Sequence, residues 1–410
     1  MKVLVIGKGG REHAIVDKVS ESQIVSKIYA LPGNVGMSKL AELVNIDVYN
    51  NQLIVDFVIE NNIELVIIGP EISLKSGLSD ILEEAGILVL GASTKAAQLE
   101  TSKNFAKKFM KKYRIQTADY EFFTKYDEAI QYVKAKSLPI VIKFDGLAAG
   151  KGVHIIEDQS QAVEVLQSLL VEKSMGDIGV VIEDFIQGDE FTLMALVNGS
   201  NVYPFQTSRD FKRIYDNDEG PNTGGMGSIT PYNSVDKETY DQAVEVLQRT
   251  AECMIDEGIP YKGVLYGGFM VNEDGLYVIE YNARFGDPET ETALNNIESD
   301  FVQNILDLLS NEEVNFKFKN QVSAGLVLSS PGYPRTQEDN IDLVEYFKLP
   351  FKVFVMGAKK DGERIVSSGG RVLFILNQAD TSVEAYNEMY AELAKVKDNC
   401  LHYRKDLTNY

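Results

Sequence analysis

The sequence predicts a multidomain protein of mixed α/β and α+β class, with a parallel-sheet domain first and a small α+β domain last. Three observations support this prediction. The 410 residues are too many for one hydrophobic core, and the length suggests about two to four domains. Residues 1 to about 100 alternate β-rich runs with helical segments, which is the rhythm of a parallel sheet. Later runs place strand directly beside strand, which favours mixed α+β units.

The first predicted domain spans residues 1–102. Its β-rich runs are VLVIG, KIYAL, LVIIG and ILVLG, and a helical pattern covers residues 74–85. The loop GKGGREH follows the first run and comes close to the dinucleotide fingerprint G-x-G-x-x-G, but Glu12 stands in place of the third glycine. The second run ends in LPGNVG without a carboxylate for a ribose, so a nicotinamide dinucleotide is disfavoured.

Small or polar residues follow the strands of this domain. The backbone amides of Gly9 and Gly10, at a helix N-terminus, are suited to one phosphate. Asn34 in PGN and Glu71 in GPE follow other strands, and the carboxyl ends of parallel strands meet at one edge. The pattern predicts a site for a small polar ligand at that edge, although an ordinary tight turn explains GKGG equally well.

The second predicted domain spans residues 103–190 and has the pattern of a small α+β lid. A basic helix KNFAKKFMKKY precedes the strands PIVIKFDG, GVHII and VVIEDFI, and helical QAVEVLQSLL lies between the last two. The loop IKFDGLAAGKGVHII joins strand to strand and has Gly152 where a P-loop needs a hydroxyl residue. We expect a flap that closes over phosphates, with Lys151 in the loop and Lys143 on the strand before it. A hairpin with solvated lysines is the alternative.

The third predicted domain spans residues 191–320. It contains the predicted strands FTLMALV, VLYGGFMV and LYVIEYN, with helices near residues 235–257 and 298–310. The NEDG turn between the last two strands predicts a hairpin, because Asp-Gly supplies the turn chemistry. The loop EGPNTGGMGS suits close approach to an anionic ligand, but a mobile surface loop has the same composition.

The stretch EYNARFGDPE carries three polar residues at alternate positions. Glu280, Asn282 and Arg284 end a predicted strand, so their side chains share one face. One charged and one neutral oxygen suit Mg²⁺, which takes hard oxygen ligands and completes its shell with substrate phosphates. An arginine beside the metal can neutralise a phosphoryl group in transit. A surface salt-bridge cluster is the alternative, but three such residues before a Gly-Asp-Pro turn favour the metal site.

The fourth predicted domain spans residues 321–410, where SAGLVLSS, FKVFVMGA and GGRVLFIL precede the helical VEAYNEMYAELAKV. The chain has 40 Lys plus Arg against 61 Asp plus Glu, and its formal net charge of -21 would repel nucleic acid or an anionic membrane. No apolar run approaches a signal peptide or a membrane span, so we expect a cytoplasmic protein. Two distant cysteines and three scattered histidines predict neither a disulfide framework nor a zinc site.

Taken together, these motifs resemble the ATP-grasp superfamily, and specifically the phosphoribosylamine-glycine ligase (glycinamide ribonucleotide synthetase) family. The resemblance extends over the whole chain. It is carried, in order, by GKGGREH, PGNVG, GPE, QLETSK, IKFDGLAAGKGV, GPNTGGMG, NARFGDPE, GYP and SSGGRV. Each motif is modest evidence alone, but their order and spacing are specific. The resemblance implies an N-terminal parallel-sheet domain, ATP-grasp lid and central domains, and a small C-terminal α+β domain.

The resemblance implies a step of de novo purine biosynthesis. ATP, glycine and 5-phosphoribosylamine would give glycinamide ribonucleotide, ADP and phosphate through a glycyl phosphate intermediate. ATP is then a cosubstrate, and Mg²⁺ or Mn²⁺ is the expected metal. The partners would be small molecules, with no nucleic acid and no membrane. The sequence leaves the oligomeric state open and is compatible with a monomer.

The resemblance also implies roles for individual residues. The metal ligands would be Glu280 and Asn282. The donors to the ATP phosphates would be Lys103, Lys143, Gly146, Gly150, Lys151 and Gly152. Adenine would be read at Glu183, Asp184, Phe185 and Ile186, and the ATP ribose at Glu190. The phosphoribosylamine site would include Gly9, Gly10, Asn34 and Glu71. The catalytic residues would be Arg284 and Asp287, with Asp210, Pro288 and Glu289 lining the place where the substrates meet.

Three departures from the family pattern concern local contacts. The pattern more often has alanine at position 144 and histidine at position 211, where this chain has Phe144 and Phe211. The strand VLYGGFMV carries no carboxylate, so a second metal ion would need other ligands. The rival functions are another ATP-grasp carboxylate-amine ligase, a purine-pathway carboxylase, a nucleotide-binding module without turnover and, from a different class, a nicotinamide oxidoreductase.

Overall fold

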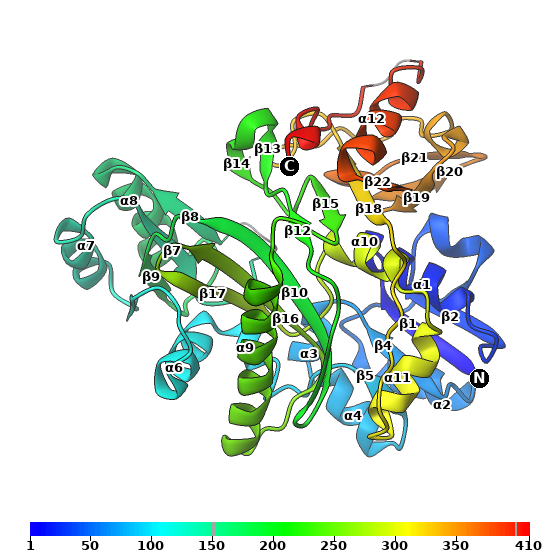
Figure 1. The fold of residues 1–410 in the computed structure, drawn as a ribbon, viewed down its shortest axis with the longest axis horizontal. Helices are drawn as coiled ribbons and strands as arrows, with labels where there is room; N and C mark the ends of the chain where they lie inside the picture. The colour runs from blue at the N-terminus through cyan, green and yellow to red at the C-terminus, as the bar shows by residue number, and fades with distance from the viewer. Residues whose placement is uncertain (149–151, 398–399) are drawn as a thin grey trace.

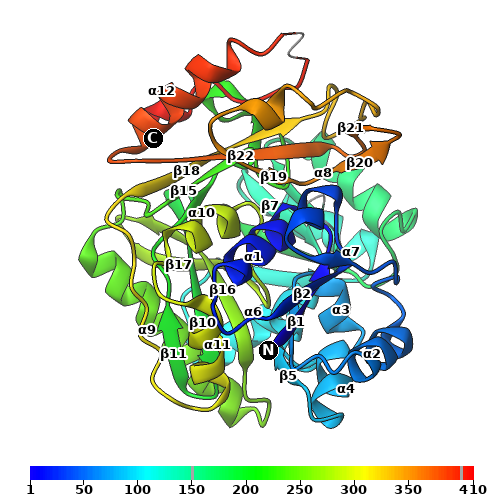
Figure 2. The same ribbon diagram turned by 90° about the vertical axis from the view of Figure 1, so that its right-hand side faces the viewer.

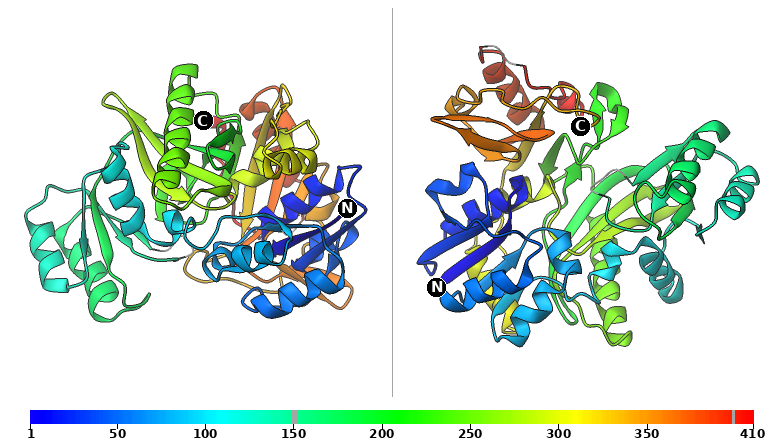
Figure 3. Two further views of the ribbon diagram at one scale, coloured as in Figure 1. Left: turned by 90° about the horizontal axis from the view of Figure 1, so that it is seen from below. Right: turned by 180° about the vertical axis from the view of Figure 1, so that it is seen from behind.

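The computed structural model describes residues 1–148, 152–397 and 400–410. The lid projects to the left in Figure 1, the N-terminal domain lies at the lower right and the C-terminal domain at the top right. Figure 3 shows from two further sides that the lid lies at one end of the molecule and the two terminal domains at the other. Across the described ranges, no helix has both the length and the hydropathy that crossing a bilayer requires.

The N-terminal domain is built on a parallel sheet with strand order β3-β2-β1-β4-β5. The strands are β1 (Lys2–Gly7), β2 (Lys27–Pro32), β3 (Glu42–Leu43), β4 (Leu65–Ile68) and β5 (Leu88–Leu90). The helices are α1 (Gly10–Ser20), the 3-10 helix η1 (Val35–Lys39), α2 (Asn51–Glu60), α3 (Glu71–Lys75), α4 (Leu78–Glu84) and α5 (Gln98–Thr101). The parallel sheet confirms the prediction. The predicted helix at 74–85 is interrupted, because Gly77 between α3 and α4 has a φ of 84°.

The lid is a four-stranded antiparallel sheet with order β6-β9-β7-β8. Its elements are β6 (Tyr120–Phe123), α7 (Tyr126–Lys134), β7 (Ile140–Phe144), β8 (Val153–Ile156), α8 (Gln159–Leu166) and β9 (Val180–Asp184). The antiparallel pairing of β7 with β8 confirms that the glycine loop joins strand to strand. The lid has a hydrophobic core of its own between residues 129 and 182, in which Phe144 is buried. Helix α6 (Lys103–Tyr113) instead packs Phe109 and Met110 into the main core.

The central sheet has strand order β11-β10-β16-β17 and is antiparallel throughout. Its strands are β10 (Asp189–Asn198), β11 (Asn201–Pro204), β16 (Lys262–Asn272) and β17 (Gly275–Asn282), and helices α9 (Lys237–Asp256) and α11 (Phe301–Leu309) pack against it. The predicted hairpin of β16 and β17 is confirmed. Helix α10 (Glu289–Asn296) was not predicted from the sequence, and all its residues are buried.

The C-terminal domain contains a sheet with order β12-β15-β18-β22-β19. Its strands are β12 (Arg209–Asp210), β15 (Gly227–Thr230), β18 (Val322–Ser329), β19 (Lys352–Val355) and β22 (Arg371–Ala379). Helix α12 (Ser382–Leu393) covers the outer face of this sheet, as Figure 2 shows. Two short hairpins complete the chain, β13 (Arg213–Tyr215) with β14 (Glu219–Asn222), and β20 (Ala358–Asp361) with β21 (Arg364–Ser367). The glycine loop between β14 and β15 is thereby attached to the C-terminal domain.

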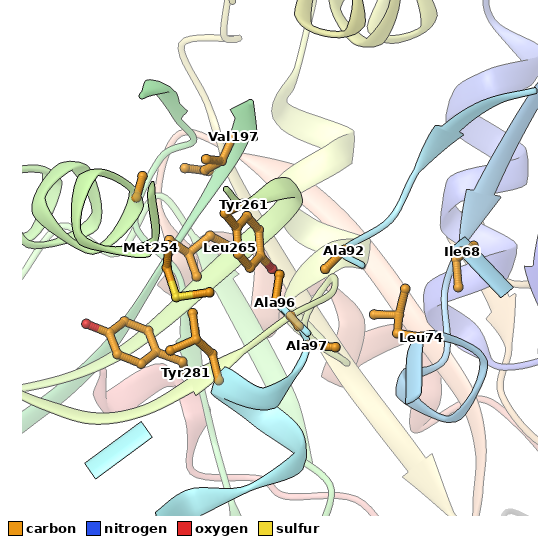
Figure 4. Packing of buried hydrophobic residues seen from close by; sticks show 14 of the residues in the cluster. Ile68, Leu74, Ala92, Ala96, Ala97, Val197, Met254, Tyr261, Leu265 and Tyr281 are labelled. Atoms are coloured by element: carbon orange, nitrogen blue, oxygen red, sulfur yellow. The ribbon is translucent and has the colours of Figure 1, made fainter. Parts of the chain in front are cut away.

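The N-terminal domain and the central sheet share one hydrophobic core. Figure 4 shows Ile68 and Leu74 of the N-terminal domain near Ala92 and Ala96, with Leu265 and Tyr281 of the central sheet beyond them. Full burial of a large apolar side chain contributes roughly 1.5–3 kcal/mol. A shared core of this size fixes the two domains against each other, whereas the separate core leaves the lid free of that constraint. The boundaries at 102, 190 and 320 stay predictions.

Candidate active site

A cleft of about 330 Å³ lies where the four parts of the chain meet. The N-terminal domain contributes Arg11 and Glu71, and α6 contributes Lys103 and Lys107. The lid contributes Lys143, Gly146, Gly152 and Val153, and the central sheet contributes Tyr266, Ile279, Glu280 and Asn282. The C-terminal side contributes Asp210, Lys212, Thr223, Gly224 and Arg371. Cations, carboxylates and a few apolar groups therefore face one enclosed space.

Many of the predicted site residues lie in this cleft. Those that line it are Glu71, Lys103, Lys143, Gly146, Gly152, Asp210, Glu280, Asn282, Arg284, Asp287 and Glu289. Those that do not line it are Gly9, Gly10, Asn34, Glu183, Asp184, Phe185, Ile186, Glu190 and Pro288. Gly150 and Lys151 lie outside the described residues. The sequence therefore located one site from segments that are up to about two hundred residues apart.

Glu280 and Asn282 lie on β17 and point to the same cleft, as their alternation predicted. Burial opposes the charge of Glu280, but Lys212, Lys143 and Lys103 outweigh it, so the pKa of Glu280 is below its ordinary value. Within the described ranges, no group of three or more His, Cys, Asp and Glu residues is arranged to hold a metal by itself. One carboxylate and one amide oxygen fit Mg²⁺, which takes its other ligands from phosphates and water.

Three lysines on α6 and β7 form the cationic side of the cleft. Lys103 and Lys107 are one helical turn apart on α6, and the Lys103 Nζ donates to the Gly146 carbonyl at 3.1 Å. The carboxylate of Glu183, only 4% exposed, forms ion pairs with both Lys107 and Lys143. Burial lowers the pKa of Lys107 to about 8, against the opposing effect of Glu183. The buried Glu183 carboxylate lies between Lys107 and Lys143 and fixes the positions of their ammonium groups without help from solvent.

The side chain of Glu183 contacts two lysines and is not directed at the predicted adenine hinge. Its carboxylate is directed at the lysines, so reading of a base would depend on the backbone that follows β9. Asp184 forms an ion pair with Lys136 at 2.7 Å, and the Phe185 side chain is partly exposed. Met110, Val153 and Ile279 supply the apolar part of the cleft that a purine ring needs.

Arg284 is held between two carboxylates. Its Nη2 is 3.0 Å from Glu100 Oε1, its Nε is 3.6 Å from Glu71 Oε2, and its Nη1 donates to the Phe285 carbonyl at 3.0 Å. Burial opposes the charge of Arg284, but Glu100 and Glu71 outweigh it and raise its pKa. Glu71, predicted as a substrate ligand, is therefore also a partner of the predicted catalytic arginine.

A second group of carboxylates lies across the cleft. Glu289 Oε1 accepts hydrogen bonds from the Tyr266 hydroxyl at 2.8 Å and the Thr192 hydroxyl at 3.2 Å. Burial, followed by the nearby charge of Glu289, raises the pKa of Asp210 well above its ordinary value. Lys212 forms an ion pair with Glu190, the predicted ribose ligand. A cationic group of a ligand would relieve the repulsion between Asp210 and Glu289.

The start of α1 differs from the prediction of an open phosphate site. The Gly9 amide donates to Glu12 Oε2 at 2.6 Å, and the Glu12 side chain fills the space against Gly7 and Gly69. Glu12 stands at the third glycine position of the dinucleotide fingerprint, and its carboxylate takes the amide hydrogen of Gly9 at the N-terminus of α1. Asn34 donates to the carbonyls of Lys8 and Val355, both at 2.9 Å, and accepts from Gly36 at 2.9 Å. Its amide joins two domains.

Several cleft residues were missed by sequence reasoning. These are Arg11, Glu100, Lys107, Lys212, Tyr266 and Arg371. Some had a usable signal: Lys107 follows Lys103 by one helical turn, and Lys212 lies two residues after Asp210. Arg371 was part of the quoted SSGGRV motif, but nothing in the sequence indicated that the C-terminal domain reaches the cleft.

Three family models together match most of the chain. The N domain of phosphoribosylglycinamide synthetase matches residues 1–100, its ATP-grasp (A) domain matches residues 101–290, and its C domain matches residues 323–409. A phosphoribosylamine–glycine ligase of Halalkalibacterium halodurans is 44% identical over 412 residues, covering 99% of this chain and 96% of the relative. One from Streptococcus pneumoniae serotype 4 is 43% identical and covers 99% of both chains.

Solved structures agree with the sequence comparison. The crystal structure of phosphoribosylamine–glycine ligase from Thermotoga maritima has a TM-score of 0.87 and 32% identity, and covers 99% of this chain and 100% of that chain. The biotin carboxylase domain of Hydrogenobacter thermophilus 2-oxoglutarate carboxylase has a TM-score of 0.75 over 98% of this chain and 91% of that chain. At 17% identity it shows only that the fold is shared. The matches over the full length of the chain show that it belongs to the phosphoribosylglycinamide synthetase family of ATP-grasp ligases.

Proposed function

We propose that the chain ligates glycine to 5-phosphoribosylamine with ATP, giving glycinamide ribonucleotide, ADP and phosphate. The observation that carries this proposal is one cleft that combines phosphate-binding lysines, two oxygen ligands for a metal and a separate group of carboxylates. Phosphoryl transfer depends on positioning and charge neutralisation rather than on a protein nucleophile. We further propose that the protein acts in the cytoplasm on small molecules alone.

ATP is placed with its base between the lid and α6. Met110, Val153 and Ile279 would contact the purine. Glu190, whose carboxylate is paired with Lys212 of the cleft, would hold the ribose. The phosphates would be bound by Lys103, Lys143 and Lys107, with Gly146 and Gly152 beside them. Gly150 and Lys151, which lie outside the described residues, stay predicted phosphate donors. Glu280 and Asn282 would hold Mg²⁺ or Mn²⁺, which would neutralise phosphate charge when bound.

Glycine is placed between the phosphates and the second carboxylate group. Asp210 and Glu289 would hold its ammonium group, which relieves their mutual repulsion. One glycine carboxylate oxygen then attacks the γ-phosphorus in line, and the bond from that phosphorus to the β-phosphate bridging oxygen breaks. ADP leaves, and glycyl phosphate remains. Arg284, already charged and fixed by Glu100 and Glu71, would stabilise the transferred phosphoryl oxygens.

The amine of phosphoribosylamine completes the reaction. Its nitrogen attacks the acyl carbon of glycyl phosphate, an amide forms and inorganic phosphate leaves. The nitrogen must also lose a proton, and Asp287 is the carboxylate that we place there as acceptor, since it lines the cleft next to Gly9. Glu71 would hold the ribose hydroxyls at the same edge.

The proposal is tested by measuring ADP release from the purified chain. Release is expected only when glycine, phosphoribosylamine and a divalent metal are all present, with glycinamide ribonucleotide as the product. ADP release that depends on bicarbonate or another carboxylate would instead support a different ATP-grasp ligase. Nucleotide binding without turnover under all substrate combinations would support a binding module.

A further inference from the structure

Arg371, the first residue of β22, extends from the C-terminal domain into the cleft. Its Nη2 is 2.9 Å from Asp287 Oδ1, and its Nη1 donates to the carbonyls of Asp287, at 3.2 Å, and Gly224. Within the described part of the chain, these contacts use three of the five N–H groups of the guanidinium. The remaining N–H groups are held on a fixed plane at the wall of the cleft.

The backbone of α1 offers a poor place for the phosphate of a ribose 5-phosphate. The Gly9 amide already donates to Glu12, and a Cβ on Gly9 would lie 3.0 Å from Glu12 Oε2 and 3.6 Å from Asp287 Oδ2. A phosphate there would therefore face the Glu12 carboxylate, which already accepts the hydrogen of the Gly9 amide. Like charges at such distances repel strongly in a buried site.

Gly10 is closed off by packing. A Cβ on Gly10 would lie 2.5 Å from Glu291 Oε1 and 2.9 Å from Met356 Cγ, so not even a methyl group fits on that side. The Glu291 side chain is fully buried, and its two oxygens have no hydrogen-bond partner in the described residues. Burial and the charge of Asp287 raise the pKa of Glu291 well above its ordinary value. Both effects disfavour the charged form of Glu291.

Most other cations of the cleft have a carboxylate partner, whereas Lys103 donates to the Gly146 carbonyl next to the predicted phosphate flap. Lys107 and Lys143 are paired with Glu183, Lys212 with Glu190, and Arg284 with Glu100 and Glu71. Arg11 is paired with Glu12 and donates to the Phe285 carbonyl at 3.2 Å. Arg371 has a single carboxylate partner, comes from a different domain than the lysines, and adjoins the predicted amine-binding residue Asp287.

We propose that Arg371, and not the start of α1, binds the 5-phosphate of phosphoribosylamine. The inference rests on the proposed function and adds to it a residue that selects the second substrate. A planar guanidinium recognises two phosphate oxygens at once. With the phosphate on Arg371, the amine at the far end of the same ribose is directed along Asp287 toward the acyl phosphate. The C-terminal domain would then select the ribonucleotide, while the lid selects ATP.

The test compares the product glycinamide ribonucleotide with its 5′-hydroxyl analogue, glycinamide riboside. Isothermal titration calorimetry of wild type gives the ratio of the two dissociation constants, which measures the preference for the phosphate. In Arg371→Gln this ratio is expected to fall roughly tenfold to a hundredfold, because a hydrogen-bonded charge is lost. Arg371→Lys should recover part of the ratio. Arg364→Gln is the matched control, since Arg364 is an exposed arginine of the same domain paired with Asp361.

The outcomes separate this inference from the proposed function. Binding of a non-hydrolysable ATP analogue should stay within about twofold of wild type in Arg371→Gln, which shows that its fold is intact. A wild-type ratio in a folded Arg371→Gln protein overturns the inference and leaves the proposed function in place. If wild type does not bind glycinamide ribonucleotide, both the inference about Arg371 and the proposed function are wrong. If Arg371→Gln does not fold, the ratio in Arg371→Lys decides, and an unchanged ratio there overturns the inference.

Discussion

At the scale of single residues, Glu280 is a carboxylate surrounded by cations. Lys212, Lys143 and Lys103 outweigh the effect of burial and hold its pKa below the ordinary value, so it is charged at neutral pH. A carboxylate in this setting is available to a metal without a proton having to leave. The same surroundings mean that its charge also stabilises the fold, because the three lysines would otherwise repel one another.

Glu280→Gln keeps the shape of the side chain and removes the charge. Turnover is expected to fall about a hundredfold, or roughly 3 kcal/mol, because a key electrostatic contact to the transferred phosphate is lost. A titration of Mg²⁺ against ADP formation should also show a weaker affinity for the metal. Arg284→Lys should lose rate but keep the Mg²⁺ dependence of wild type, because lysine keeps the charge and lacks the planar group. If Glu280→Gln has wild-type turnover and wild-type Mg²⁺ dependence, the metal assignment is wrong. Glu280, Asn282 and Arg284 would then form only a surface ion cluster.

The lysines around Glu280 determine how Glu280→Gln should change the free energy of unfolding. Crowding of carboxylates would predict that Glu280→Gln is neutral or stabilising. Because the pKa of Glu280 is lowered in the folded state, its charge instead stabilises the fold at pH values above the pKa that it has in the unfolded chain. This stabilisation is lost as the pH falls through the pKa of Glu280 in the folded state. The free energy of unfolding of Glu280→Gln at neutral pH is therefore expected to be slightly lower than that of wild type.

Lys107 predicts a pH dependence of ATP binding. Its pKa is lowered to about 8 by burial, so it loses its proton as pH rises through about 8. The ATP phosphates favour the protonated form, and binding above this pH must take up a proton. Affinity for MgATP, measured by calorimetry from about pH 7 to about pH 9.5, is expected to fall with rising pH. Lys107→Arg should abolish most of this fall. A constant affinity for wild type would show that Lys107 does not face the phosphates.

The sequence identified residues whose neighbours along the chain share their chemistry. Glu280 and Asn282 alternate on one strand, and Lys103 and Lys143 follow from local pattern together with the family motifs. Arg371 and Glu100 lie in the family motifs SSGGRV and QLETSK, but they reach the cleft only through the folding of distant segments, so no neighbouring residue indicated their place in the site. Glu183 shows a third case, since its position in the sequence was recognised but its side chain contacts lysines from two other elements.

At the scale of elements, the strands were predictable and α10 was not. Strands of the N-terminal sheet are continuous apolar runs, because both faces are buried. Helix α10 has the sequence ETETALNN and lacks an apolar stripe, although it is completely buried. Several of its polar groups are matched by other segments: Thr292 contacts Ser228 and Thr230, and Asn295 donates to Ser323. The carboxylate oxygens of Glu291 have no such partner in the described residues. A pattern that depends on hydrophobic periodicity cannot find such a helix.

The lid is expected to move as a unit when ATP binds. Its core is separate from the main core, and it supplies Lys143 of β7, Val153 of β8 and Gly152 just before β8 to the cleft. Hydrogen exchange in β7 and β8 should slow when MgATP is added, because contacts to the nucleotide restrict opening. Peptides from α9, which lies on the central sheet, serve as the internal control and should not change. Equal exchange in the lid with and without nucleotide would contradict this prediction.

At the scale of the whole molecule, the last residues of the chain anchor the loop that reaches the cleft. The fully buried Arg404 forms ion pairs with Asp218 and Asp406, both at 2.6 Å. Asp218 also accepts from the Tyr410 hydroxyl at 2.8 Å. Asp218 lies between β13 and β14, just before the glycine loop that contributes Thr223 and Gly224 to the cleft. The C-terminus thereby supports one wall of the site.

Arg404→Met keeps an extended side chain but leaves Asp406 without its charged partner. The free energy of unfolding is expected to fall by about 3–5 kcal/mol, the usual cost of breaking a buried ion pair. Thermal and denaturant unfolding measure this loss. Lys395→Gln is the control, because Lys395 is an exposed lysine of the same domain paired with Glu392, and its replacement should have little effect. Equal stability of Arg404→Met and wild type would show that the pair is not needed.

The buried polar helix α10 also constrains how the chain is made on the ribosome. Asn296 donates to Gln206 Oε1 and to the carbonyls of Thr230 and Gln321, all at 3.0 Å, and accepts from Gln378 at 3.0 Å. Leaving a buried polar group unmatched costs about 1–3 kcal/mol. The helix is translated long before β22, so its partners are incomplete until Gln378 has emerged. A nascent chain that stalls before residue 378 therefore leaves polar groups of α10 without all their partners and accessible to proteases and chaperones. The fold that starts at β1 is complete only when segments of the last hundred residues have packed against α10.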